Sequence, residues 1–195
     1  MTCIAGYIDK KTKTTYMGAD TAGVSGYIIS RRKDSKIFSR TNPYGNSMLI
    51  GFTGSFRMGQ LLRYKLTIPK HIKNIDTYEY MCTYFIDEVK NILTENGFTK
   101  IVNNQNEIGK FLVAYNQRLF IIDSDLQVGE SQLNYNACGS GGDIALASMR
   151  TLDNYSKENY SGEAIINTAL QVSEDFCSSV RKPFVILSLK EEDNV

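Results

Sequence analysis

Short apolar runs alternate along the chain with longer segments in which apolar residues recur at helical spacing. The short runs, several of them β-branched, predict strands; they cover 3–8, 14–18, 27–29, 37–38, 47–52, 111–115, 118–122, 135–138 and 184–189. The periodic segments predict four helices; they lie between Ser55 and Ile68, over about 77–96, from Gly142 to Leu152, and over about 161–179. Amphipathic helices beside largely antiparallel strands predict an α+β fold with two central sheets and helices packed outside.

Polar segments between these elements predict the turns. The turn at 10–13 closes an N-terminal hairpin, and Asn116-Gln117 is a two-residue hairpin loop. The Asn-rich stretch 98–110 predicts a loop, and the acidic residues in 123–125 are more typical of a capped turn than of a cation site. With 195 residues, no linker and no internal repeat, we expect one domain over 1–195.

Composition narrows the classes of partner. Hydrophobic residues make up 42% of the chain, and 22 basic residues balance 21 acidic ones to a net charge of +1. This balance provides no bulk attraction to nucleic acid or an anionic membrane, and the cluster Arg31-Arg32-Lys33 with Lys36 favours a solvated strand or loop. There is no apolar run near 18 residues and no apolar N-terminal leader, so we expect a soluble, cytoplasmic protein without a membrane partner.

The residue inventory restricts the chemistry. The four cysteines are scattered without a CxxC pair, which disfavours a zinc site or a disulfide framework, and we expect no metal or organic cofactor. His71, the single histidine, lies in a polar connector and is a poor candidate for a catalytic base. The Gly139-Ser140-Gly141-Gly142 segment matches neither a Walker motif nor a dinucleotide fingerprint, and in isolation it predicts only a tight turn.

The amino terminus offers a nucleophile. Met1 precedes Thr2, a residue small enough for methionine removal, which would leave a free threonine. Its α-amine, with a reference pKa of about 8, can activate its own hydroxyl. Taken alone, this start is also typical of an ordinary N-terminal strand.

Several short motifs appear together in a recognisable order; they are Thr2, Gly18-Ala19-Asp20, Lys36, Gly51-Phe52-Thr53-Gly54, Gly139-Ser140-Gly141-Gly142 and Asp175. In this order and spacing the chain, from Thr2 to about Leu189, resembles the catalytic β-type subunits of the proteasome family. It looks nearest to the bacterial peptidase that pairs with a ring unfoldase and to proteasome-like proteins of bacteria and phages. In that family an Asp and a Lys partner lie 16 positions apart, as Asp20 and Lys36 do.

The resemblance implies a four-layer αββα sandwich and a set of catalytic roles. Thr2 would be the nucleophile with its α-amine as base, Lys36 the adjacent cation, and Asp20 the group that keeps Lys36 charged and oriented. The backbone N–H of Gly54 would stabilise the oxyanion.

The resemblance also implies supporting and substrate-binding residues. Ser140 and Asp175, with Ser178 beyond them, would form the hydrogen-bond set near the threonine. Phe52 would line the primary specificity pocket, favouring apolar side chains, and Val24 would contact substrate largely through its backbone.

Three features depart from the family pattern. Two additional residues separate Thr2 from Asp20, which the turn at 10–13 can absorb, and Val24 stands where many members have threonine. Cys3 is a rival nucleophile beside Thr2, although no processing rule would expose it as the first residue. A retained Met1 would leave Thr2 with an amide instead of an amine and would block the mechanism.

These observations predict a threonine-type endopeptidase that cleaves unfolded polypeptides or peptides. The resemblance implies a homo-oligomeric ring or stacked rings, and the absence of an ATPase motif implies that any unfoldase is a separate partner. Two alternatives stay open: a catalytically silent assembly or scaffold subunit, and a small-molecule amide hydrolase of the same fold.

Overall fold

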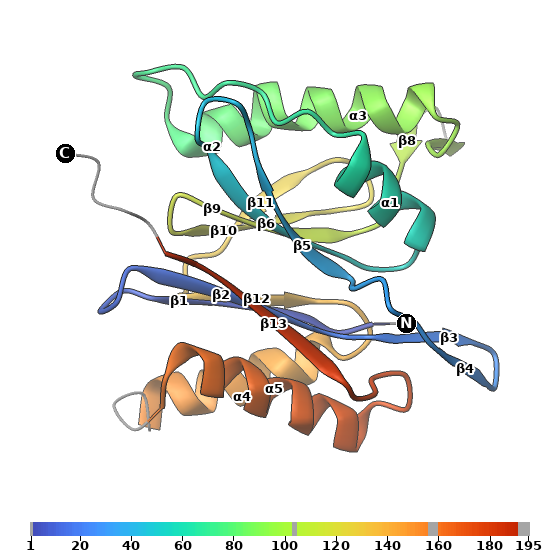
Figure 1. The fold of residues 1–195 in the computed structure, drawn as a ribbon, viewed down its shortest axis with the longest axis vertical. Coiled ribbons are helices and arrows are strands. Elements are labelled where there is room, and N and C mark those ends of the chain that lie inside the picture. Colours follow the sequence, from blue (N-terminus) through green and yellow to red (C-terminus); the bar gives the residue numbers. More distant parts are fainter. Residues whose placement is uncertain (1, 103–104, 156–159, 191–195) are drawn as a thin grey trace.

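The computed structural model, which describes residues 2–102, 105–155 and 160–190, stacks two β-sheets between two layers of helices (Figure 1). Both sheets are antiparallel, and their strand orders are β12-β1-β2-β13 and β11-β10-β9-β6-β5. The first comprises β1 (Ile4–Asp9), β2 (Thr14–Asp20), β12 (Tyr135–Cys138) and β13 (Phe184–Lys190). The second comprises β5 (Ile37–Thr41), β6 (Ser47–Phe52), β9 (Phe111–Tyr115), β10 (Arg118–Ile122) and β11 (Val128–Glu130). The predicted αββα sandwich is confirmed.

Helices cover the outer face of each sheet (Figure 1). The second sheet carries α1 (Phe56–Tyr64), α2 (Thr77–Tyr80), a π-helical turn (Met81–Phe85) and α3 (Ile86–Glu95). The first sheet carries α4 (Gly142–Tyr155), described as helix up to that residue, and α5 (Gly162–Phe176). The apolar residues that recur at helical spacing in the predicted helix over about 77–96 are buried; they are Met81, Phe85, Val89 and Leu93. No described helix is long and apolar enough to span a bilayer.

Three buried clusters match the layers. One lies between the second sheet and its helices, and another between the first sheet and the α4–α5 pair. The third cluster lies between the two sheets and includes Ile4, Met17, Leu49 and Leu112. Strands with apolar side chains on both faces are therefore required, which explains the near-continuous apolar runs at 3–8 and 47–52.

The structure corrects several boundaries. The stretch 98–110, predicted as a loop, contains the two short strands β7 (Lys100–Val102) and β8 (Gln105–Glu107). The small-residue segment before Tyr27 forms β3 (Ala22–Ser25), which pairs with β4 (Ile28–Arg31) as a projecting hairpin (Figure 1). The last helix ends at Phe176 instead of about 179, and Phe176 itself is exposed. The final strand, predicted over 184–189, extends to Lys190, and 191–195 lie outside the described residues.

Candidate active site

Strand pairing brings the predicted site residues to one end of the two sheets. In the first sheet Ile4 pairs with Ala19 and with Cys138, so the start of β1 meets the ends of β2 and β12. This register brings together Thr2, which precedes β1, Asp20, which ends β2, and Ser140, which follows β12. In the second sheet Ile37 pairs with Gly51, which places Lys36 beside the end of β6.

Asp20 and Lys36 form a buried ion pair. The Lys36 Nζ lies 2.9 and 3.0 Å from the two carboxylate oxygens, and neither residue is more than 1% exposed. The carboxylate also accepts hydrogen bonds from the backbone N–H of Cys3 at 3.0 Å and of Ala22 at 3.2 Å. These donors stabilise a negative charge at a buried site.

Burial governs the electrostatics of Lys36. Removal from water lowers the pKa of its ammonium, and the attraction and hydrogen bond of Asp20 oppose that decrease. The net direction is downward, so Lys36 gives up its proton more readily than a free lysine. A cation held by one buried carboxylate can support negative charge on a neighbouring hydroxyl oxygen.

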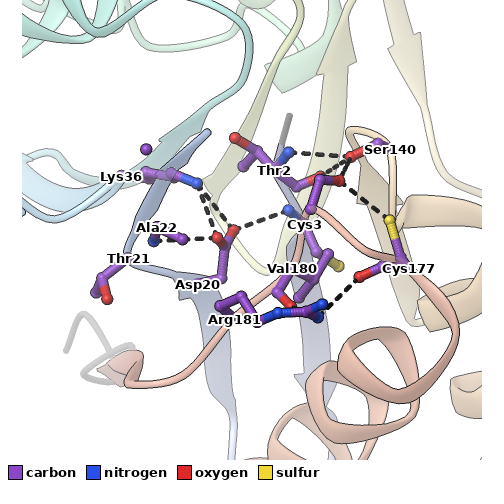
Figure 2. A network of polar contacts seen from close by, with 12 residues as sticks. Thr2, Cys3, Asp20, Thr21, Ala22, Lys36, Ser140, Cys177, Val180 and Arg181 are labelled. Atoms are coloured by element: carbon purple, nitrogen blue, oxygen red, sulfur yellow. Dashed lines mark hydrogen bonds and ion pairs between the residues drawn. The ribbon is translucent and has the colours of Figure 1, made fainter. Parts of the chain in front are cut away.

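Thr2 lies between Lys36 and Ser140 (Figure 2). It is 3% exposed, and its backbone nitrogen donates to the Ser140 hydroxyl at 3.1 Å. Its carbonyl oxygen accepts from the Gly141 N–H at 3.2 Å and from the Ser140 hydroxyl at 3.3 Å. A side chain on Gly139 would place its Cβ 2.2 Å from that carbonyl oxygen, so the close approach of the turn to Thr2 requires glycine.

Gly54 follows β6 in a left-handed conformation, with φ of +77°. It lines the same pocket as Thr2 and Lys36, which has a volume of about 210 Å³. A backbone N–H at the rim of such a pocket can stabilise a developing oxyanion.

The predicted substrate-binding residues Val24 and Phe52 line this pocket as well. Sequence reasoning missed its other members, which are Gly23, Ile28, Ser30, Arg32 and Phe56. The Arg32 guanidinium lies 4.0 Å from the Phe56 ring centroid, and its ion pair with Asp34 is solvent-accessible. Gly23, Ile28 and Ser30 reach the pocket only through the folded β3–β4 hairpin, which no local pattern could have indicated, whereas Phe56 is the first residue of α1, two positions after Gly54.

Asp175 and Ser178, the other predicted members of the hydrogen-bond set, lie at the C-terminal end of α5. Both are exposed, Asp175 in the last turn of α5 and Ser178 just after it. The neighbouring Ser179 points inward instead: it is 1% exposed, and its hydroxyl lies 2.7 Å from that of Ser140. Because α5 ends three residues early, Cys177 and Val180 form a turn in which the second serine faces the site.

The structure also places the two rival nucleophile and base candidates. Cys3 is fully buried in the cluster beneath α4 and α5, where burial raises the pKa of its thiol to about 12. A neutral buried thiol is a poor nucleophile. His71 binds the hydroxyl of Tyr115 and the carbonyl of Ile75, both at 2.8 Å, as part of the connector before α2. Within the described ranges, no group of three His, Cys, Asp or Glu residues could hold a metal ion.

No protein-family model and no curated protein matches this sequence. Solved structures do match over nearly the whole chain. BPH from Thiobacillus denitrificans is 16% identical with a TM-score of 0.77, and the match covers 98% of this chain and 100% of that one. Eukaryotic HslV from Trypanosoma brucei is 20% identical with a TM-score of 0.67, covering 97% and 99% of the two chains.

A third match is Anbu, an ancestral beta-subunit, from Yersinia bercovieri. It is 14% identical with a TM-score of 0.67, and the match covers 97% of this chain and 82% of that one. At these identities the likeness concerns the backbone, and it agrees with the element order and layers described above. The chain therefore has the N-terminal-nucleophile hydrolase fold of proteasome β-type subunits.

Proposed function

We propose that this protein is a proteasome-like threonine peptidase in which Thr2 becomes the first residue after removal of Met1. The observation that carries the proposal is that Thr2, Lys36 and Gly54 line one pocket, and that Asp20 forms a buried ion pair with Lys36. One domain over 1–195 would then contain a complete nucleophile, base, cation and oxyanion donor.

The proposed reaction proceeds through an ester on Thr2. The α-amine takes the hydroxyl proton as Oγ attacks the scissile carbonyl carbon, and the Gly54 N–H stabilises the oxyanion of the tetrahedral intermediate. As the C–N bond breaks, the leaving amine takes the proton from the Thr2 ammonium. Water, deprotonated by the same amine, then attacks the ester carbonyl carbon. As the C–Oγ bond breaks, Oγ takes the proton back from the ammonium, and the new carboxylic acid is released and ionises. The charge of Lys36 favours the neutral amine and the deprotonated Oγ throughout.

The substrate and partners follow from the same proposal. A pocket that includes Phe52, Val24 and Phe56 favours apolar side chains of unfolded polypeptides or peptides. A homo-oligomer is proposed, and the Anbu structure from Pseudomonas aeruginosa, a helical assembly, has a TM-score of 0.64 to this chain. Any ATPase unfoldase would be a separate cytoplasmic partner.

The state of the amino terminus tests the proposal directly. Intact-mass measurement of the purified protein should show loss of one methionine, and an epoxyketone should label Thr2 because that reagent reacts with both hydroxyl and amine. Epoxomicin is a suitable probe, since BPH has been solved in complex with it. Full-length mass without labelling would favour the silent assembly subunit. Labelling combined with cleavage of small amides, but not of peptides, would favour the amide hydrolase.

Gly54→Ala should lower kcat by about 10²-fold while costing only about 1 kcal/mol of stability, because alanine disfavours the positive φ and reorients the N–H. Gly45→Ala is the matched control: its φ is +87°, and no atom lies within 4 Å of a built Cβ there, as at Gly54. Melting temperatures should decrease similarly in both variants. Equal kcat values in the two variants would remove Gly54 from the proposed site.

The pH dependence of kcat should have a descending limb below the 10.5 of a free lysine. Burial lowers the Lys36 pKa, so as pH rises the folded protein loses this charge before an exposed lysine would. A reaction that requires charged Lys36 then slows. We would measure kcat from pH 6 to 10.5 and verify folding by circular dichroism at each point. Constant or rising kcat up to pH 10.5 in folded protein would contradict the role of the Lys36 charge.

A further inference from the structure

A chain of hydrogen bonds leads from Thr2 to a cysteine outside the predicted site. The Thr2 nitrogen lies 3.1 Å from the Ser140 hydroxyl, which lies 2.7 Å from the Ser179 hydroxyl. The Ser179 hydroxyl in turn lies 3.1 Å from the thiol of Cys177. The proposed mechanism uses neither Ser179 nor Cys177.

The number of hydroxyl hydrogens on Ser140 and Ser179 sets the donor-to-acceptor direction of this chain of hydrogen bonds. Ser140 has one hydroxyl hydrogen, which it can donate to the Thr2 carbonyl oxygen at 3.3 Å. Its contact with Ser179 then requires Ser179 to be the donor. Ser179 has no second hydroxyl hydrogen, so it accepts from the Cys177 thiol. With the thiol as terminal donor, every hydroxyl in the chain both donates and accepts, and such chains strengthen cooperatively.

The backbone after α5 holds the terminal thiol in position. Cys177 caps the helix, and its carbonyl accepts from the Val180 N–H at 3.1 Å. The Arg181 guanidinium donates to the carbonyls of Glu174, Cys177 and Val180 and so ties the turn together. Ser179 is 1% exposed, so its hydroxyl depends on protein partners instead of water.

We propose that Cys177 is a positioning residue for the threonine-peptidase reaction, acting through Ser179 and Ser140 to hold the nitrogen of Thr2. The inference rests on the proposed function. It assigns to a thiol the place at the end of the supporting hydrogen-bond set that Asp175 and Ser178, both exposed, do not occupy. Loss of the thiol should affect the alignment of the amine with Oγ and leave substrate binding in the pocket unchanged.

The first test is kinetic. Cys177→Ala should lower kcat about 3- to 10-fold, the range for loss of one hydrogen bond, with KM unchanged. Cys177→Ser, which restores a donor, should recover most of kcat. Cys82→Ala is the matched control, because Cys82 is also a free, half-buried cysteine but lies in the π-helical turn on the opposite outer layer.

A double-mutant cycle distinguishes positioning from a general loss of packing. Ser179→Ala breaks the same chain, so the Cys177→Ala/Ser179→Ala double variant should be no slower than Ser179→Ala alone. Multiplying losses in the double variant, or an unchanged kcat in Cys177→Ala, would overturn the inference.

The second test does not depend on peptidase activity. Burial raises the pKa of the Cys177 thiol, but hydrogen bonds of Ser179, Ser140 and the Val180 backbone together lower it by more. The two hydroxyls have this effect because, once the thiol has lost its proton, they can turn and donate toward the thiolate, the reverse of their direction in the neutral state. Iodoacetamide alkylates the thiolate and releases iodide, so Ser179→Ala and Ser140→Ala should slow alkylation of Cys177 at fixed pH. Peptide mapping of the same samples measures the alkylation of Cys82, which serves as an internal control.

The two tests separate the possible failures. Unchanged alkylation rates would show that the thiol is not coupled to the serines, whatever the peptidase activity. Wild-type protein that lacks Met1 and cleaves no peptide would refute the proposed function, whereas cleavage that is insensitive to Cys177→Ala would refute the role of Cys177 alone.

Discussion

Replacing Thr2 by alanine in the processed protein should lower kcat for fluorogenic peptides by about 10⁴-fold or more, the scale seen when a catalytic nucleophile is removed. The Asp20–Lys36 pair and the Gly54 N–H would remain, but no oxygen would be available to form the ester. Alanine at position 2 is also small enough to permit removal of Met1, so the variant still begins with a free amine. KM should change little, because the pocket walls at Val24 and Phe52 are intact.

Two variants define the controls for this result. Thr12→Ala removes an exposed threonine in the turn between β1 and β2 and should have wild-type kcat. Thr2→Ser retains the hydroxyl and should retain epoxyketone labelling, which Thr2→Ala should lose. Peptide cleavage by Thr2→Ala within a few-fold of wild type would show that another group is the nucleophile.

Lys36→Met should both abolish cleavage and destabilise the fold, by about 3–5 kcal/mol, because it leaves a buried carboxylate without its cation. Asp20 is fully buried, and the two N–H donors that remain, from Cys3 and Ala22, carry no net charge. Urea denaturation would give the change in the free energy of unfolding, and peptide cleavage at a temperature where the variant is folded would give the change in kcat.

A second substitution separates stability from catalysis. Lys36→Met/Asp20→Asn removes both charges and should recover part of the lost stability without recovering activity. As a matched surface pair, Arg32–Asp34 has a distance of 2.7 Å but side chains 37% and 35% exposed. Asp34→Asn should therefore change stability by less than about 1 kcal/mol. A single Lys36→Met variant as stable as wild type would contradict a buried, charged pair.

Much of the architecture follows from local pattern. The apolar runs at 3–8, 47–52 and 111–115 became the central strands β1, β6 and β9. The short polar stretches between runs became the predicted turns. The prediction failed where apolar spacing is weak: 98–110 reads as a polar loop, yet its backbone pairs as β7 and β8. Backbone hydrogen bonds can form a short hairpin without an apolar face, so composition does not reveal it.

The candidate site shows the same division. The 16-residue spacing indicated Asp20 and Lys36, and the structure joins them. The local sequence does not indicate, however, which of the adjacent serines Ser178 and Ser179 faces the site. That depends on where α5 ends and how the turn at Cys177 closes. The pocket wall supplied by Ile28, Ser30 and Arg32 depends likewise on a hairpin that the sequence suggested only in part.

The sequence by itself determined the alternation of strands and helices, the buried stripe of each central element and the motifs that resemble a proteasome subunit. These are properties of neighbouring residues, set by the periods of the helix and the strand. The tertiary structure alone decided that Ser179 and Cys177, and not Asp175 and Ser178, continue the hydrogen bonds from Thr2. The contact between Thr2 and Ser140 joins residues 138 positions apart, and the contact between Ser140 and Ser179 joins residues 39 positions apart. Such contacts form only when the register of the sheet and the end of α5 are both in place.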